Sequence, residues 1–338
     1  MSRPPIFPRN STPRVSRLVY ILAASHSGST LLAMLLGAHS DAVTVGELKA
    51  TNMGDSGKYR CSCGCLIVEC GFWTEVGRLM EKRGIPGFDI THAGTSLFEV
   101  PSRYAHRLLA PLYREPAWEF VRDAALSLSP VWHAWLRQTQ IRNTALVEAL
   151  HEISGARLVV DSSKIALRLK YLLRNPALDI KVIWMVRDGR AVSLTYTDEW
   201  SFADASNAAL RGGGSGARRT PSRQTMRDAA REWRRSNEAS QCLVERLPAA
   251  QWTQIHYEEL CANPGPTLRR LCEFLGLDPA RINLNFRSRT QHVIGNGMRF
   301  DQSSEVRLDE RWRGHLTAED LAAFDSVGGD LNRRYGYV

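Results

Sequence analysis

The stretch that most constrains the fold is residues 18–37, LVYILAASHSGSTLLAMLLG. Residues 18–24 are apolar and β-prone, residues 25–28 (SHSG) break the pattern, and residues 29–36 resume as a mostly apolar run. A β-prone run, a short polar break and a second apolar run predict a strand, a tight loop and a helix that enters the core.

The loop predicted here suits an anion. At the start of the helix several backbone N–H groups converge, and the helix dipole adds partial positive charge. Gly28 permits close approach of the backbone, and Ser25, Ser27, Ser29 and Thr30 surround it with hydroxyl groups. We therefore expect this loop to hold a phosphate or sulfate group; a serine-rich turn without a ligand is the structural alternative.

The loop departs from the P-loop pattern G-x-x-x-x-G-K-[ST] of nucleotide hydrolases. When Gly28 and Thr30 are aligned with the pattern, Ala23 stands at the first glycine and Ser29 at the lysine. Because that lysine neutralises the β- and γ-phosphates of a nucleoside triphosphate, the sequence argues against ordinary ATP or GTP hydrolysis.

Three segments resemble the sulfotransferases that use 3′-phosphoadenosine 5′-phosphosulfate (PAPS). SHSGSTLL (residues 25–32) is similar to their 5′-phosphosulfate loop, VRDGRAVSLTY (186–196) to their second signature, and HYEELCANPGPTLRRLCEFLGL (256–277) to a third, weaker one. The resemblance implies an α/β fold with a P-loop-type parallel sheet flanked by helices. It also implies PAPS as co-substrate and the transfer of a sulfuryl group.

The resemblance further implies ligands for the rest of the nucleotide. Arg187 is expected to bind the 3′-phosphate, with a hydroxyl from Ser193 or Thr195; the family spacing falls on Thr195, where a serine is usual. Tyr257 follows a predicted strand and is expected either to contact adenine or to pack. Arg299, in a glycine-flanked loop, is expected to be a further phosphate ligand.

Three candidate catalytic residues, Glu47, His26 and Lys164, come from the same resemblance. Glu47 follows a short predicted strand, residues 43–45, and matches the Gly-Glu pair that supplies the general base in the tyrosylprotein branch; a solvated or capping glutamate is the alternative. His26 stands where the family usually places lysine or arginine. We expect bound PAPS to keep His26 protonated, so that it donates to the leaving phosphate.

Lys164 ends the segment VVDSSK. Its resemblance to a lysine in a comparable place of the tyrosylprotein branch implies that it neutralises the transferring sulfuryl group. We expect Ser162 or Ser163 to cap a helix over residues 165–174. Hydrophobic residues followed by Asp161 also resemble the Walker B strand of kinases. A P-loop-type kinase therefore stays an alternative function.

Composition bounds the remaining possibilities. The chain has 338 residues, 43% hydrophobic and 23% charged, with a net charge of +9, which is typical of a globular protein with an anionic ligand. The charge alone favours the other alternative function, a non-catalytic nucleotide or nucleic-acid binder.

We expect a disordered leader over residues 1–15 and one domain over 16–338, with a helical cap inserted at about 74–151. We also expect no transmembrane segment, no nucleic-acid partner and a cytoplasmic location. The acceptor is expected to be the hydroxyl, or an amine, of a small molecule or carbohydrate.

Seven cysteines include a cluster at Cys61, Cys63, Cys65 and Cys70. The spacing C-x-C-x-C-x4-C is not a standard zinc pattern. Metal binding, a local disulfide and reduced thiols all stay open. No metal ligand is expected in the active site, because fixed positive groups can stabilise the charge of the reaction.

Overall fold

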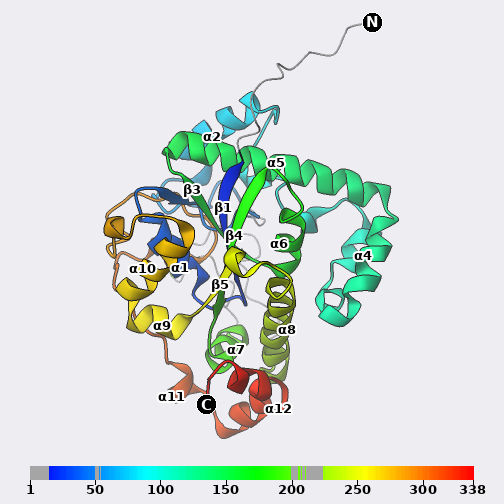
Figure 1. Cartoon of the computed structure of the whole chain (residues 1–338), viewed down its shortest axis with the longest axis vertical. Coiled ribbons are helices and arrows are strands. Elements are labelled where there is room, and N and C mark those ends of the chain that lie inside the picture. Colours follow the sequence, from blue (N-terminus) through cyan, green and yellow to red (C-terminus); the bar gives the residue numbers. More distant parts are fainter. Residues whose placement is uncertain are drawn as a thin grey trace, which may run out of the picture.

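The computed structural model describes residues 15–49, 53, 55–198, 205, 207, 210 and 224–338 (Figure 1). The expected leader lies outside the described residues, apart from Val15. Within the described residues, no helix is long and apolar enough to cross a membrane.

A five-stranded sheet forms the centre of the fold, with strand order β2-β3-β1-β4-β5 and every neighbouring pair parallel. The strands are β1 (Ser16–Ala23), β2 (Ala42–Thr44), β3 (Leu158–Lys164), β4 (Leu178–Val186) and β5 (Trp252–His256). The expected α/β fold with a parallel sheet is confirmed. Since parallel strands share one direction, their carboxyl ends meet at a single edge, where α/β proteins bind ligands.

Helices cover both faces of the sheet (Figure 1). Alternate residues of β1 belong to two separate buried clusters, Leu18, Tyr20 and Leu22 to one and Val19 and Ile21 to the other, as the period of two in a strand requires. The first face is packed by α2 (Gly71–Lys82), α5 (Pro130–Ser154) and α6 (Ala166–Leu172). The second is packed by α1 (Ser29–Gly37), α9 (Tyr257–Ala262) and α10 (Pro264–Leu275).

The segment expected to be an inserted cap is helical and divides into two parts. Helices α2 and α5 pack in the core on the sheet. The residues between them include α3 (Arg103–Leu108), η4 (Pro111–Arg114), η5 (Pro116–Trp118) and α4 (Glu119–Ser127). This intermediate part packs with the start of α5 and with α6 in a small cluster around Leu126 and Trp132, and Figure 1 shows α4 standing away from the sheet.

The C-terminal half of the chain completes the carboxyl edge. Helices α7 (Gly189–Thr197), α8 (Met226–Val244) and α12 (Ala318–Arg334) share a cluster around Trp233 and Phe324. Thr317 begins α12 with a capping box to Asp320, which satisfies two helix-end donors reciprocally. The short helices η10 (Gly297–Phe300) and α11 (Trp312–His315) lie between α10 and α12 in the chain.

One expected boundary is wrong. Ser162 and Ser163 do not cap a helix: β3 runs through both to Lys164, and α6 begins at Ala166 after Ile165, which makes no side-chain cap. The β1–β3 register shifts between Tyr20 and Leu22. Lys164, which pairs with Leu22, lies in the left-handed region at φ 70°, which is uncommon for a residue with a side chain.

Candidate active site

The β1–α1 loop is built as the sequence predicts. Helix α1 starts without a side-chain cap, so its first N–H groups stay available to a ligand. The Ser27 hydroxyl is buried and has no hydrogen-bond partner among the described residues. Gly28 has φ 87°, and a Cβ there would overlap the Tyr257 ring. Ser29 and Thr30 open α1 and are buried, and Ser25 borders a neighbouring cavity.

His26 forms the tip of this loop in a left-handed conformation, at φ 64°. Its ring meets Tyr196 edge to face with 5.0 Å between centroids. Burial, followed by the charges of Lys164 and Arg187, lowers the pKa of His26 to about 3. The imidazole is therefore neutral at pH 7 when PAPS is not bound. The protonated state expected with bound PAPS would be opposed by the charges of Lys164 and Arg187.

Glu47 lies at the carboxyl edge, just beyond β2, and is bound by two lysines. Lys164 Nζ donates to Glu47 Oε1, and Lys49 Nζ lies 2.9 Å from Oε2. Burial would raise the pKa of Glu47, but the charges and hydrogen bonds of Lys164 and Lys49 outweigh it and hold this pKa at about 2. Glu47 is therefore ionised, buried and paired, neither a solvated glutamate nor a helix cap.

A buried network holds this segment in place. Asp161 Oδ1 accepts from the backbone N–H of Leu48 at 3.0 Å and of Ser163 at 2.8 Å, and Ser163 Oγ accepts from the N–H of Lys49 at 3.0 Å. Arg168 Nη2 lies 3.4 Å from the other oxygen of Asp161. The carboxylate that suggested a kinase thus positions the residues on either side of Glu47, and the kinase alternative loses its main support.

Arg187 directly follows β4, on the opposite side of the loop from Glu47. One Nη donates to the carbonyl oxygen of His26 at 2.8 Å, and the other to Asp309, at 3.0 Å to both its backbone and side-chain oxygens. The guanidinium stacks over Tyr257 at 4.3 Å. Hydrogen bonds from Arg311 and Arg187 hold the pKa of Asp309 well below its usual range.

The two candidate hydroxyls beyond Arg187 differ in environment. Ser193 is fully buried, and its Oγ has no partner among the described residues. Thr195 is partly exposed, and its hydroxyl donates to the Ala191 carbonyl within α7 at 3.2 Å. Thr195 is the more accessible of the two.

Tyr257 and Arg299 occupy packing positions. The Tyr257 ring is wedged between Gly28 and the Arg187 guanidinium, and its hydroxyl donates to the Arg307 carbonyl at 3.3 Å. Arg299 is buried, donates to the carbonyls of Arg60 at 3.1 Å and Gly295 at 2.6 Å, and stacks on Tyr59 and Phe300. The segment that reaches Arg187 is instead the one carrying Asp309.

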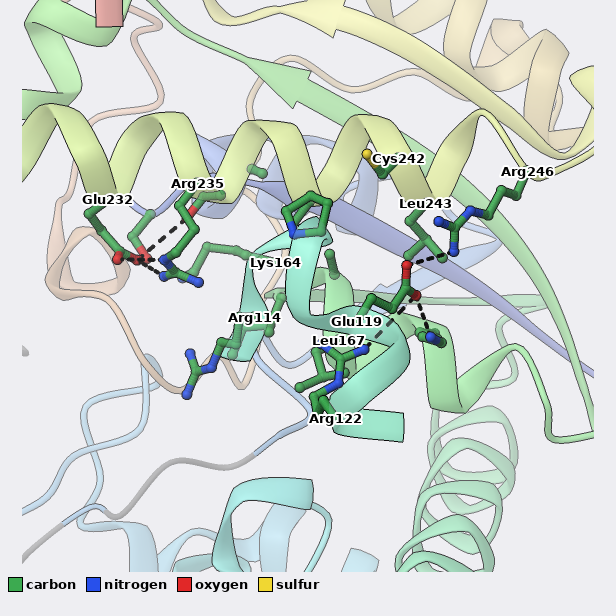
Figure 2. A pocket seen from close by; sticks show the side chains of 18 of the residues that line it. Arg114, Glu119, Arg122, Lys164, Leu167, Glu232, Arg235, Cys242, Leu243 and Arg246 are labelled. Carbon is green, nitrogen blue, oxygen red and sulfur yellow. Dashed lines mark hydrogen bonds and ion pairs between the residues drawn. The ribbon is translucent and has the colours of Figure 1, made fainter. Parts of the chain in front are cut away.

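A cavity of about 150 Å³ opens beside the catalytic candidates (Figure 2). It is bordered by Ser25, Lys49 and Lys164 from the sheet edge, by η4, η5 and α4 on one side and by α8 on the other. A larger cavity, of about 1090 Å³, shares Pro116, Glu232, Arg235 and Cys242 with it and continues along α8.

Charge around the smaller cavity is mostly positive. Two lining residues, Glu119 and Glu232, are acidic, and seven are basic: Lys49, Arg114, Arg122, Lys164, Lys170, Arg235 and Arg246. Several of these basic residues are neutralised, as Figure 2 shows for the ion pairs of Glu119 and Glu232. Burial and then nearby Arg235 lower the pKa of Arg114 to about 10.

Comparison with known proteins identifies the family to which the chain belongs. The sulfotransferase family model matches residues 96–280, which is more than half of the chain, and the chain belongs to this family. The family is PAPS-dependent, so the expected activity class and co-substrate are confirmed at family level. No protein of curated function matches the sequence.

Solved sulfotransferases resemble the chain at low identity. The sulfotransferase domain of the curacin biosynthetic pathway is 18% identical, covering 96% of this chain and 99% of that one, with a TM-score of 0.45. The domain of the Synechococcus PCC 7002 olefin synthase is 17% identical, covering 99% of each chain, with a TM-score of 0.46. Mouse SULT7A1, solved with 3′-phosphoadenosine 5′-phosphate (PAP), is 14% identical, covering 96% of this chain and 90% of that one, with a TM-score of 0.42.

Sequence reasoning missed two residues of the site. Lys49 lies two residues after Glu47, but its approach to that carboxylate depends on the hydrogen bond from its N–H to Ser163, 114 positions away. Asp309 reaches Arg187 from 122 positions away. No local pattern marks either contact.

Proposed function

We propose that this chain transfers a sulfuryl group from PAPS to a hydroxyl of a small-molecule or carbohydrate acceptor bound in the cavity beneath α4 and η4. The observation that carries the proposal is the Glu47 carboxylate with its two lysines. It is placed at the carboxyl edge of the sheet, beside an uncapped helix N-terminus and a cavity. An amine acceptor would use the same groups.

The residues of the β1–α1 loop fit the 5′-phosphosulfate end of PAPS. The buried Ser27 hydroxyl without a partner among the described residues and the uncapped start of α1 supply donors for anionic oxygens. Arg187 would hold the 3′-phosphate, because a guanidinium binds phosphate through two parallel hydrogen bonds. Asp309 competes for that guanidinium, and we propose that it yields Arg187 to the nucleotide. Thr195 and Ser193 are the neighbouring hydroxyls, with Thr195 preferred for its exposure.

Glu47 is proposed as the general base, and Lys164 as the group that sets its basicity. A carboxylate with a pKa of about 2 is a weak base at pH 7. When PAPS is bound, its sulfuryl group is the electrophile, and Lys164 is drawn towards that anionic end. Once Lys164 leaves Glu47, the largest cationic influence on the carboxylate is gone, and its pKa rises. Glu47 then accepts the hydroxyl proton of the acceptor while Lys49 keeps it oriented.

His26 is proposed to act as a neutral donor rather than as a cation. Its low pKa follows from burial and from the nearby charges of Lys164 and Arg187. One ring N–H still offers a hydrogen bond to an oxygen of the departing phosphate, since neutral imidazole carries one donor. The positive charge in this arrangement comes from Lys164 and Arg187. In other family members, the lysine or arginine usual at the position of His26 would add to it.

The acceptor is proposed to carry an anionic group besides its hydroxyl. Arg114 lines the cavity, donates through Nε to the Leu109 carbonyl at 2.8 Å and stacks over Phe98 at 4.5 Å. The remaining face of this partly buried guanidinium suits a carboxylate, phosphate or sulfate of the acceptor. Arg299 is proposed to shape its loop rather than to bind phosphate, and Tyr257 to support the β1–α1 loop.

The proposal is tested by incubating the chain with ³⁵S-labelled PAPS and a panel of hydroxylated acceptors, half of them anionic, and following transfer of the label to each acceptor. Labelled product is expected with anionic acceptors first. Arg114→Ala should raise the acceptor KM with little change in kcat, whereas Arg227→Ala, on the exposed face of α8, should change neither. PAPS turnover with no acceptor dependence across the panel would contradict the proposed acceptor chemistry.

A further inference from the structure

A second cluster of reactive side chains lies outside the active site. Cys61, Cys63 and Cys70 from the cysteine-rich loop meet His292, which is 222 positions away from Cys70 in the chain. The four ligand atoms all lie within 4.8 Å of one another. Cys61 and Cys70 are buried, and Cys63 and His292 are partly buried.

The spacings match the edges of a metal tetrahedron. With Zn–S near 2.3 Å and Zn–N near 2.0–2.1 Å, tetrahedral geometry gives S···S edges of about 3.8 Å and S···N edges of about 3.6 Å. The observed distances are 3.7 Å from Cys63 Sγ to Cys70 Sγ, 3.7 Å from Cys61 Sγ to His292 Nδ1, and 3.5 Å from Cys70 Sγ to the same nitrogen. Three of the six ligand–ligand distances therefore match a zinc tetrahedron, and the other three are no longer than 4.8 Å.

The loop is shaped to present these atoms. The Cys61 N–H bonds to the Cys65 carbonyl at 3.0 Å, the Gly64 N–H bonds to the Cys61 carbonyl at 2.9 Å, and Gly64 takes a φ of 91°. The resulting tight turn directs Cys61 and Cys63 to the cluster and leaves Cys65 exposed. Cys70 is the N-cap residue of α2, where the helix dipole stabilises a thiolate.

His292 is held in a ligand orientation by two sets of contacts. Its ring stacks on Phe72, with 4.2 Å between centroids and 4° between planes. Ser62 lies between two of the cysteines and bonds the residues on both sides of His292, donating to the Gln291 carbonyl and accepting from the Val293 N–H at 2.7 Å. The approach of His292 is thus part of the backbone pairing of the two segments.

We propose that Cys61, Cys63, Cys70 and His292 form a structural zinc site. Three thiols lose their protons to solvent and neutral His292 lends the lone pair of Nδ1, so that Zn²⁺ with its four ligands carries one net negative charge. Four protein ligands close the coordination sphere, as in structural rather than catalytic sites. No electron is transferred, because Zn²⁺ has no redox chemistry under these conditions.

The site clamps the segment that supports the proposed base. Beyond His292, the Ile294 N–H bonds to the Val45 carbonyl at 2.9 Å, and the Gly295 N–H bonds to the Tyr59 hydroxyl at 2.7 Å. A Cβ at Gly295 would lie 3.6 Å from Glu47 Cγ. Zinc binding therefore stabilises the wall against which Glu47 packs, without touching the reacting groups.

The experiment is elemental analysis of the purified full-length chain, together with Co²⁺ reconstitution. We expect about one zinc per chain, released by a mercurial thiol reagent, and visible bands of tetrahedral Co²⁺ bound to thiolates after exchange. Cys70→Ser and His292→Ala should lose the zinc and lower the melting temperature. Cys65→Ser and His315→Ala, which alter exposed residues, should keep both.

Three results would overturn the proposal. One is wild-type protein that contains no zinc and gives no tetrahedral Co²⁺ spectrum. Another is stoichiometric iron in place of zinc. The third is a Cys63–Cys70 disulfide found by peptide mapping of freshly purified chain. The wild-type Co²⁺ spectrum decides the matter even where Cys70→Ser fails to fold.

Discussion

Two ion pairs stand on opposite sides of the β1–α1 loop, and they differ in what surrounds them. The Glu47 carboxylate is buried between Lys164 and Lys49, with a side chain 10% exposed. The Arg187 guanidinium is equally buried, but its partner Asp309 is 28% exposed and comes from a segment near the C-terminus. The first pair is enclosed by the sheet edge, whereas the second is open to solvent on its acidic side.

The difference shows how one edge can serve two tasks. A buried carboxylate whose cations are fixed nearby has a pKa controlled by their positions, so it suits proton transfer. A buried cation whose carboxylate is partly solvated can exchange that partner for a phosphate at smaller cost, because Asp309 regains water when it is displaced. We therefore expect changes at the first pair to affect turnover, and changes at the second to affect donor affinity.

The largest effect is expected for Glu47→Gln, which keeps the shape of the side chain and removes the base. Turnover should fall by about 10²–10⁴-fold, the usual contribution of a general base, while the Kd for PAP stays nearly unchanged. The matched variant Asp309→Asn should keep turnover and leave PAP binding equal or tighter. Steady-state kinetics and calorimetry measure the two quantities, and near-normal turnover of Glu47→Gln would remove Glu47 from the mechanism.

Arg187→Ala should give the next largest effect, on affinity. PAP binding should weaken by about 2–4 kcal/mol, the scale of losing a buried charge-assisted pair. Binding of adenosine 5′-phosphosulfate, which lacks the 3′-phosphate, should change much less. Arg190→Ala, which removes the neighbouring guanidinium bound to Asp188, serves as control. Equal weakening for both nucleotides would show that Arg187 does not read the 3′-phosphate.

The pH dependence of the free energy of unfolding tests the charge state of His26, which lies between the two ion pairs. Its pKa is about 3 in the fold and about 6.5 in an unfolded chain, so between these values the unfolded state binds the extra proton. Stability contributed by neutral His26 is therefore present above pH 6.5 and lost as pH falls. Between pH 7 and pH 5 the loss is about 2 kcal/mol.

His26→Asn should remove this part of the acid sensitivity, and asparagine tolerates the left-handed backbone at this position. Urea unfolding at pH 7 and pH 5 measures the difference, with His315→Asn as an exposed control. If wild type and His26→Asn lose the same stability on acidification, the fold does not lower the pKa of His26.

The smallest expected effect distinguishes the roles of the two lysines that bind Glu47. Lys49→Met removes one of its cations, which raises the pKa of Glu47 while Lys164 still holds the carboxylate. Turnover should change by less than about tenfold, the equivalent of one pKa unit. Lys164→Met should cost more, because Lys164 also faces the transferring group. Equal losses of kcat in the two variants would contradict separate roles.

Local patterns predicted the strand-end positions well. Apolar runs before SHSG and before Arg187 marked buried strands, and the parallel sheet then necessarily brought Ser27, Glu47 and Arg187 to one edge. Polar residues inside β3 were misread: Ser162 and Ser163 resemble a helix cap in sequence, but here they extend the strand, and Ser163 anchors Lys49.

Contacts between distant segments could not be predicted. His292, Asp309 and Lys49 have no flanking pattern, and each meets its partner only after strands and loops have paired. The charge state of His26 also depends on contacts between segments that are distant in sequence. The sequence places a histidine in an anion loop, which favours protonation, whereas the fold surrounds it with Lys164 and Arg187.

Binding of the PAPS nucleotide by the β1–α1 loop and Arg187 can be measured by thermal unfolding of the full-length chain with PAP, with adenosine 5′-phosphosulfate and with ATP plus Mg²⁺. PAP at about 100 times its Kd adds about 2.7 kcal/mol to stability, which corresponds to a rise of several degrees in melting temperature for a chain of this size. We expect that rise for PAP, a smaller one for adenosine 5′-phosphosulfate, and little change with ATP. No shift with PAP, or an equal or larger shift with ATP and Mg²⁺, would contradict this expectation.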